Sequence, residues 1–213
     1  MEIIRITFNA FGVNTYIVFD PVSRECAVID PGMVSEKDRE LLSKIITENN
    51  LLPTNLINTH LHVDHVMGND FIRKYYNLKL KANKRDEFLG EMLSGQKRMF
   101  GLSDDGSSEA IEEYLSDGDE IRLGNEKLKV LEVPGHSPGG ISLYSKKDNF
   151  VITGDSLFEG SIGRTDLPGG DMQTLLHAIN KQLLSLPDDT MVYPGHGNPT
   201  TIGNEKRNNP FLR

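Results

Sequence analysis

The first thirty residues carry short apolar runs that are typical of β-strands. β-Branched and aromatic side chains dominate three segments, 3–8, 16–18 and 27–29. The turn-forming sequences Asn-Ala-Phe-Gly and Asp-Pro separate these segments. The pattern therefore predicts three strands joined by short turns at the start of the chain.

After these strands the apolar spacing changes to that of a helix. Between Glu36 and Asn49, apolar side chains recur at helical intervals. Ser35 and Asp38 have the spacing of a capping box, which would start the helix. Three further elements are predicted in this half: a short buried strand at 56–59 and helices at 69–77 and 84–100.

The second half of the chain repeats the order of strands, a helix and a strand. Its predicted strands are 127–133, 140–145, 149–153 and 191–193, and its predicted helix is 171–186. Residues 101–118 are expected to form a connector with one short helix, and the polar tail from 198 to dock back on the body. Two such halves indicate an α/β (α+β) fold with two packed sheets and outer helices, a four-layer αββα sandwich in which 1–213 form one domain.

Composition and charge exclude several classes of protein. The chain has 213 residues, of which 37% are apolar and 25% charged, as in ordinary globular domains. No apolar run approaches the ~18 residues that span a bilayer, and the N-terminus lacks the features of a secretion signal. The net charge of −8 argues against nucleic-acid and membrane partners. Because Cys26 is the single cysteine, a reducing cytoplasm is expected.

The candidate chemistry is concentrated in the segment Thr59-His60-Leu61-His62-Val63-Asp64-His65. His60 and His62 alternate along an extended segment, so their rings face the same side. Asp64 and His65 follow where the chain turns into a helix. Three imidazoles and a carboxylate could not be buried here without partners, and a borderline-soft metal ion such as zinc or iron would satisfy them.

Three further polar residues each follow a predicted strand and a glycine. They are His136, Asp155 and His196, after Gly135, Gly154 and Gly195 respectively. Each alone is explained as a turn residue, but together with the first cluster they provide seven potential ligands. Seven ligands are enough for two metal ions.

With these residues the sequence resembles the metallo-β-lactamase-fold hydrolases, and among them the hydroxyacylglutathione hydrolases, also called glyoxalase II. The resemblance spans nearly the whole chain, and segments 154–158 and 163–171 narrow it to the glyoxalase-II-like and persulfide-dioxygenase-like branches. It implies the metallo-β-lactamase fold and two divalent metal ions, with zinc as first choice and iron or manganese as alternatives. By resemblance, one ion takes His60, His62 and His136, the other takes Asp64, His65 and His196, and Asp155 bridges both.

The resemblance also implies a reaction. A metal-bridging hydroxide, oriented by Asp64 as the catalytic residue, would attack a small-molecule thioester such as S-lactoylglutathione. The products would be a 2-hydroxy acid and a free thiol, whose thiolate leaves without a general acid. Arg164 stands where related enzymes bind a carboxylate of the thiol carrier, although Asp166 replaces an aromatic residue there. An exposed loop arginine is the alternative interpretation of Arg164.

Two departures from the family narrow the expectation. Full-length glyoxalase II enzymes bind glutathione with an additional C-terminal helical domain, so this chain resembles a short form. The most familiar class of zinc β-lactamases has a cysteine where Asp155 stands, which disfavours β-lactam hydrolysis. The sequence leaves the acyl group, the thiol carrier and the oligomeric state open.

Three alternative functions remain at this stage. A persulfide dioxygenase of the same fold would hold one Fe²⁺ with His60, His136 and Asp155. The run 167–171 favours the hydrolase by resemblance only. A metallo-nuclease is disfavoured by the negative charge. A metal-scavenging protein would saturate its metal, whereas three nitrogens leave the open position typical of catalysis.

Overall fold

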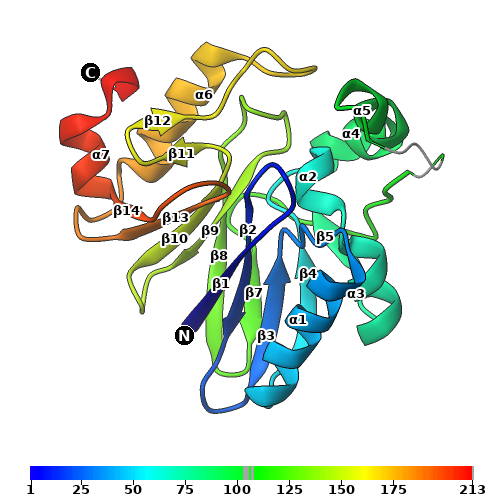
Figure 1. Ribbon diagram of the computed structural model, residues 1–213. Helices are drawn as coiled ribbons and strands as arrows, with labels where there is room; N and C mark the ends of the chain where they lie inside the picture. The colour runs from blue at the N-terminus through cyan, green and yellow to red at the C-terminus, as the bar shows by residue number, and fades with distance from the viewer. Residues whose placement is uncertain (103–105, 107, 213) are drawn as a thin grey trace.

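Two six-stranded sheets pack face to face, with helices on both outer sides, in the computed structural model, which describes residues 1–102, 106 and 108–212 (Figure 1). The first sheet has the order β1-β2-β3-β4-β5-β6, with bounds Glu2–Phe8, Val13–Phe19, Glu25–Ile29, Leu52–Ile57, Leu80–Ala82 and Glu113–Tyr114. The second has the order β14-β13-β10-β9-β8-β7, with bounds Thr200–Thr201, Met191–Pro194, Phe150–Gly154, Ile141–Ser145, Glu126–Glu132 and Glu120–Leu123. A small hairpin consists of β11 (Leu157–Phe158) and β12 (Ser161–Ile162).

Helices cover the outer face of each sheet. Those of the first half are α1 (Glu36–Glu48), α2 (Val63–Val66), α3 (Asn69–Tyr76), η1 (Lys84–Asp86), α4 (Glu87–Glu91) and α5 (Leu93–Met99). Those of the second half are α6 (Met172–Ala178), the π-helical segment η2 (Ile179–Leu183), α7 (Ile202–Asn208) and η3 (Pro210–Leu212). In Figure 1, α1 and α3 flank the first sheet, while α6 and α7 flank the second. This arrangement confirms the predicted four-layer αββα fold.

Three apolar cores lie between the four layers. The middle core joins the two sheets, and Tyr16 and Val18 of β2 face it. Their neighbours Ile17 and Phe19 face the core beneath α1 and α3, because successive side chains of a strand point to opposite faces. The third core packs α6 against the second sheet through residues such as Leu175. A strand buried on both faces carries a continuous apolar run, which explains the pattern at 16–18.

The same crossover occurs in both sheets. In the first sheet β3 and β4 are parallel, and α1 connects them. In the second, β10 and β13 are parallel, and the connection includes α6 and η2. The carboxyl ends of such parallel strands, where βα loops begin, are the usual place for a functional site in an open α/β sheet.

The helix predicted at 36–49 forms as α1. The hydroxyl of Ser35 accepts a hydrogen bond from the Asp38 amide, and the Asp38 carboxylate accepts one from the Ser35 amide. This reciprocal pair satisfies two amides that the first helical turn leaves without partners. The capping box predicted from the sequence is therefore confirmed.

The helix predicted at 84–100 is interrupted. It begins with the 3₁₀ turn η1 and then divides at Met92 into α4 and α5. The carbonyl of Gly90 accepts a hydrogen bond from the Glu109 amide, which comes from the connector. Because this carbonyl lies where α4 ends, a hydrogen bond from another segment takes the place of the i→i−4 bond that would continue the helix.

The predicted helix 171–186 is also irregular, since α6 continues as η2 and ends at Leu183.

The short helix expected within 101–118 is absent from the described part of that connector, and residues 103–105 and 107 of it lie outside the described residues. The sequence pattern missed β5, β6, β7 and β14, which have two to four residues each. It also missed α7, whose start is capped by the Thr201 hydroxyl. The tail does dock on the body, where the Asn209 amide donates to the Ser161 carbonyl.

No helix within the described ranges is both long enough and apolar enough to cross a membrane.

The loop that carries His136 approaches α6 so closely that position 135 has room only for glycine. Gly135 has φ +127°, and an added Cβ would lie 2.3 Å from the Leu175 backbone nitrogen. We therefore expect Gly135→Ala to lower the free energy of unfolding by more than about 2 kcal/mol in urea titrations.

Gly118→Ala is the matched control. Gly118 also has positive φ, at +88°, but an added Cβ would meet no atom of the described residues within 4 Å. In this variant the free energy of unfolding should fall only by the cost of a Cβ at positive φ, about 1 kcal/mol. Equal losses in the two variants would contradict the steric explanation.

Candidate metal centre

The structure brings all seven sequence-predicted ligand residues to one end of the sandwich. The cluster 60–65 follows β4, and His136 follows β8. Asp155 and His196 follow β10 and β13, the parallel pair of the second sheet. The site is therefore built from strand ends of both sheets, and neither half of the chain could form it alone.

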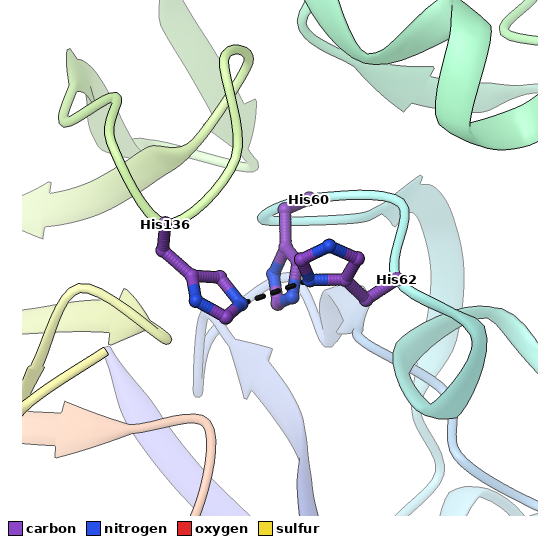
Figure 2. Close-up of side chains that lie close together, drawn as sticks. All are labelled: His60, His62 and His136. Carbon is purple, nitrogen blue, oxygen red and sulfur yellow. Dashed lines mark hydrogen bonds between the residues drawn. The ribbon is translucent and has the colours of Figure 1, made fainter. Parts of the chain in front are cut away.

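One group consists of His60, His62 and His136, and the three side chains are buried. Figure 2 shows their rings converging from two loops. His62 Nδ1 and His136 Nε2 lie 2.9 Å apart, and one nitrogen of each of the three residues lies within 4.8 Å of the others. Three converging imidazole nitrogens are the donor set of many catalytic metal sites.

The second group consists of Asp64, His65 and His196. His65 Nε2 lies 3.3 Å from His196 Nε2, and Asp64 Oδ2 lies 3.2 Å from His196 Nε2. Asp155 lies between the two groups, because one of its oxygens is 3.4 Å from His65 Nε2 and the other is 3.6 Å from His136 Nε2. Its position suits a bridging carboxylate.

These separations fit metal coordination. A tetrahedral ion with bonds of about 2.05 Å to nitrogen has ligand atoms about 3.3 Å apart. The separations of 3.2–3.6 Å in the second group and around Asp155 agree with this value. His60 Nε2 is buried and, within the described residues, has no hydrogen-bond partner, which is costly unless a cation binds there. The residues therefore fit two divalent ions, and the distances do not select the metal.

Hydrogen bonds outside the ligand set fix which ring nitrogen is available. The Thr59 hydroxyl donates to Asp30 Oδ2 at 2.6 Å, so it accepts from His60 Nδ1 at 3.1 Å. His65 Nδ1 lies 3.1 Å from the same Asp30 oxygen. The contact with Thr59 places a proton on Nδ1 of His60 and leaves its Nε2 free to bind a cation. The ion pair with Asp30 turns Nε2 of His65 toward Asp64 and Asp155.

Backbone carbonyls orient two further histidines. His136 Nδ1 donates to the Arg164 carbonyl at 2.7 Å, and His196 Nδ1 donates to the Phe11 carbonyl at 3.0 Å. Because a carbonyl can only accept, Nδ1 of both rings carries a proton, and Nε2 is the nitrogen that faces the ligand groups. His62 differs, since its Nδ1 donates to His136 Nε2, and a cation there would replace this hydrogen bond.

Asp86 holds the two ligand-bearing loops together. It is fully buried and accepts from the Leu61 amide at 3.1 Å, the Ser137 hydroxyl at 2.9 Å and the Gly139 amide at 2.6 Å. Burial raises the pKa of Asp86, while the Ser137 and Gly139 donors limit the rise. Since Leu61 lies between His60 and His62, this one carboxylate connects the first cluster to the loop of His136.

Burial and charge give the two groups opposite protonation. Burial, together with neighbouring histidines, lowers the pKa of His60 well below its ordinary value and that of His62 to about 3. Burial also opposes the charged form of His65, but Asp64, Asp155 and Asp30 outweigh it and raise its pKa well above the ordinary value. Against the same burial, hydrogen bonds to Asp155 and Asp64 raise the pKa of His196 to about 9.

The carboxylates of the second group are ionised. Burial opposes ionisation of Asp155, but the charge of His65 and hydrogen bonds from His196 and His65 hold its pKa well below the ordinary value. The pKa of Asp64 is also lowered, because His65 and the hydrogen bond from His196 outweigh burial. Two carboxylates and two histidinium rings therefore meet at the second group in the protein without metal.

A cleft of about 370 Å³ opens over both groups. Its walls include the rings of Phe11, Phe100 and Phe158, and Arg164 lies at its side. Arg164 donates through Nε and Nη2 to Asp166 at 2.7 and 2.8 Å, and both side chains are exposed. A larger depression of about 800 Å³, lined by residues of β7–β9 and η2, contains none of the seven residues.

Sequence reasoning missed the residues that support the ligands. Asp30 directly follows β3 just as Asp155 follows β10, so the pattern of a polar residue after a strand could have identified it. Asp86 ends η1 and caps the start of α4, within the segment predicted as a helix at 84–100, and no local signal marks it. The aromatic walls of the cleft come from the β1–β2 turn, the end of α5 and β11, and they become neighbours only in the fold.

The two groups should release different numbers of protons when they bind metal. Near pH 7 His65 and His196 carry protons that a cation must displace, whereas His60 and His62 are neutral. In calorimetric Zn²⁺ titrations of metal-free protein, performed in buffers of different ionisation enthalpy, we expect about two protons released at the second group and nearly none at the first. Affinity at the second group should rise as the pH approaches 9.

Single variants separate the two groups in this experiment. His136→Ala removes a member of the first group and leaves the second, and His196→Ala does the reverse. Release of about two protons should persist in His136→Ala and should fall to one proton at most, that of His65, in His196→Ala. Equal proton release from both variants would contradict the assigned protonation.

Comparison with known proteins agrees with this geometry. The pattern of the metallo-beta-lactamase superfamily matches residues 8–196. The hydroxyacylglutathione hydrolase GloC of Haemophilus influenzae is 38% identical over all of this chain and 97% of that protein. The probable metallo-hydrolase YqgX of Bacillus subtilis is 37% identical over 98% of this chain and 96% of its own.

Three solved structures at 29–35% identity share the fold of this chain. The BLEG-1 B3 metallo-beta-lactamase is 32% identical, with a TM-score of 0.88 over 99% of each chain. TTHA1623, solved in a di-iron-bound form, is 35% identical, with a TM-score of 0.85 over 98% of this chain and 100% of its own. ETHE1 from Myxococcus xanthus is 29% identical, with a TM-score of 0.80 over 99% of this chain and 84% of its own. From the superfamily match across residues 8–196 and these full-length relatives, the chain belongs to the metallo-β-lactamase superfamily of metal-dependent hydrolases.

Proposed function

We propose that the chain is a thioester hydrolase that uses two divalent metal ions and accepts substrates such as S-lactoylglutathione. The observation that carries the proposal is the pair of ligand groups joined by Asp155 beneath one cleft. His60, His62 and His136 would hold one ion, and Asp64, His65 and His196 the other. The name of the relative GloC supports the thioester substrate.

The chemistry divides between the ions and the protein. When bound, two such ions would lower the pKa of a water molecule between them and polarise a substrate carbonyl. Asp64, whose pKa is lowered, is ionised and can accept a hydrogen bond from the attacking water, which orients it. Asp155 lies between the groups and sets their separation. A thiolate leaves without protonation, so the cleft needs no separate acid.

Arg164 is proposed to bind a carboxylate of the thiol carrier. Its guanidinium already makes a two-point contact with the Asp166 carboxylate, the same geometry that a substrate carboxylate would adopt. Because both side chains are exposed, a substrate can displace Asp166 at little cost. Asp166 stands where related enzymes have an aromatic residue, and in this chain its carboxylate holds the Arg164 guanidinium in place.

The similar length of GloC supports a glutathione-type carrier. The aligned residues are 97% of GloC, a protein described as a hydroxyacylglutathione hydrolase. A relative of almost the same length therefore bears that name, and the additional helical domain of longer enzymes is not a requirement of the proposal.

A persulfide dioxygenase is the second candidate, favoured by the likeness to ETHE1. One ion in such an enzyme needs two histidines and a carboxylate. His60, His65 and Asp155 meet that description here, with one ligand atom of each within 4.8 Å of the others. Asp64 and His196 complete a second group around the same His65, which supports the hydrolase instead.

The first test is metal content and activity on the same sample. Protein purified without added metal should contain close to two metal ions per chain and should hydrolyse S-lactoylglutathione. One iron per chain, with oxygen uptake on glutathione persulfide and no thioester cleavage, would replace the hydrolase with the dioxygenase. A β-lactam belongs in the same assay because of the likeness to BLEG-1, and cleavage of it alone would contradict the thioester proposal.

Asp64→Asn tests the proposed catalytic carboxylate. We expect kcat on S-lactoylglutathione to fall at least about 100-fold, because the amide neither accepts hydrogen bonds as strongly nor balances the metal charge. Asp70→Asn is the matched control, since Asp70 lies exposed on α3 and pairs only with Lys74 among the described residues. An Asp64→Asn variant with parental activity and metal content would exclude this role.

A further inference from the structure

A small second cavity opens from the wall of the main cleft. It measures about 110 Å³ and lies between α4, α5 and the loop at 167–168. We call this cavity the annex. His62, Phe100 and Leu167 line both the annex and the main cleft, so the two spaces adjoin at the metal centre.

The lining of the annex is apolar. Leu89, Met92, Met99 and Pro168 supply most of the remaining wall. Gln96 also lines it, but its amide is occupied within the protein. Its oxygen accepts from the Val63 amide, and its nitrogen donates to the Leu61 and Leu89 carbonyls. The annex therefore has little to offer a polar ligand.

Exposed apolar side chains gather where the annex opens. Met92 is 45% exposed and Met99 61%, and Phe100 is also exposed. The Phe100 ring contacts Phe11 of the opposite wall edge to face, with 5.5 Å between centroids. Large apolar side chains grouped on a surface mark a binding region, and methionine adapts to ligands of varied shape.

We propose that the annex binds the acyl chain of the thioester and selects unbranched apolar chains with about four carbons beyond the carbonyl. This inference rests on the proposed function and names its substrate class. An apolar cavity of about 150 Å³ holds a benzene ring of six carbons. By proportion, a cavity of about 110 Å³ holds about four carbon atoms.

The arrangement of charge assigns the annex to the acyl group and the main cleft to the thiol. A thioester with its carbonyl at the metal centre sends its two substituents in different directions. Arg164 lines the main cleft and not the annex, and among the described residues of the cleft wall it is the one arginine, with no lysine beside it. A carrier that bears carboxylates therefore fits the cleft, which leaves the annex for the acyl chain.

The test is a series of glutathione thioesters from acetyl to octanoyl. Each buried methylene should raise kcat/KM about threefold to fourfold, giving roughly a 30-fold rise from acetyl to pentanoyl and a fall at octanoyl. A second series keeps the acetyl group and lengthens an apolar alkyl thiol. If kcat/KM depended on the length of the alkyl thiol and not on the length of the acyl chain, the assignment of the annex to the acyl group would be overturned.

Gly95→Leu should close the annex. Gly95 lines it from α5, and an added Cβ would meet only the far end of the Arg98 side chain, at 3.9 Å. Leucine also suits a helix better than glycine. We expect the ratio of kcat/KM for pentanoyl over acetyl thioester to fall at least about tenfold. Glu91→Leu, an exposed position outside the annex, should keep the parental ratio.

Methionine methyl signals give a readout without metal or turnover. Pentanoate added to metal-free protein should shift the ε-methyl resonances of Met92 and Met99 in NMR spectra, leave that of Met172 unchanged, and shift none of them in Gly95→Leu. Thioester hydrolysis with no length dependence and no such shifts would overturn the annex while leaving the proposed function intact. Absence of thioester hydrolysis by metal-loaded protein would overturn both.

Discussion

Two buried carboxylates that bind no proposed metal hold the candidate site together. Asp30 accepts from the amide and hydroxyl of Thr59 and faces His65, while Asp86 accepts from Leu61 and from the loop after His136. A buried carboxylate is tolerated only when donors surround it, so each loop must supply its donors for the protein to fold. The ligand positions are thus fixed by folding, before any cation binds.

This constraint also explains the contrast between the two ligand groups. In the first group the partners of the rings are neutral, a hydroxyl and a carbonyl, so burial keeps His60 and His62 uncharged. In the second, the ionised carboxylates of Asp64 and Asp155 lie against His65 and His196, so these two rings retain their protons. A divalent ion that binds in the second group would displace the protons of His65 and His196 and bring two positive charges of its own. The net charge of that group is therefore the same with or without metal.

The sequence predicted the parts of the molecule that have local signals. The strands at the start of the chain and the capping box of Ser35 were predicted correctly, because alternation and motif spacing are local properties. The seven predicted ligand residues lie close together in the structure. The break in the helix at Met92 was not found, since it depends on the Glu109 amide from a distant segment. Asp86 was missed for the same reason, because its three donors come from other loops.

The candidate ligands lie at strand ends, whereas the walls of the cleft lie on connecting segments. This difference limits how far the functional name of a relative can be applied to this chain. The seven candidate ligand residues all follow strands whose positions the two sheets determine, and solved structures at 29–35% identity have the same fold. The walls above them come from other segments, namely the β1–β2 turn with Phe11, α5, and the loop with Leu167. Gln96 joins α5 to the ligand loop through Val63 and Leu61, so this wall is held at a set distance from the metal centre. The choice of substrate therefore depends on these segments, where a single side chain can change the space available without disturbing any ligand.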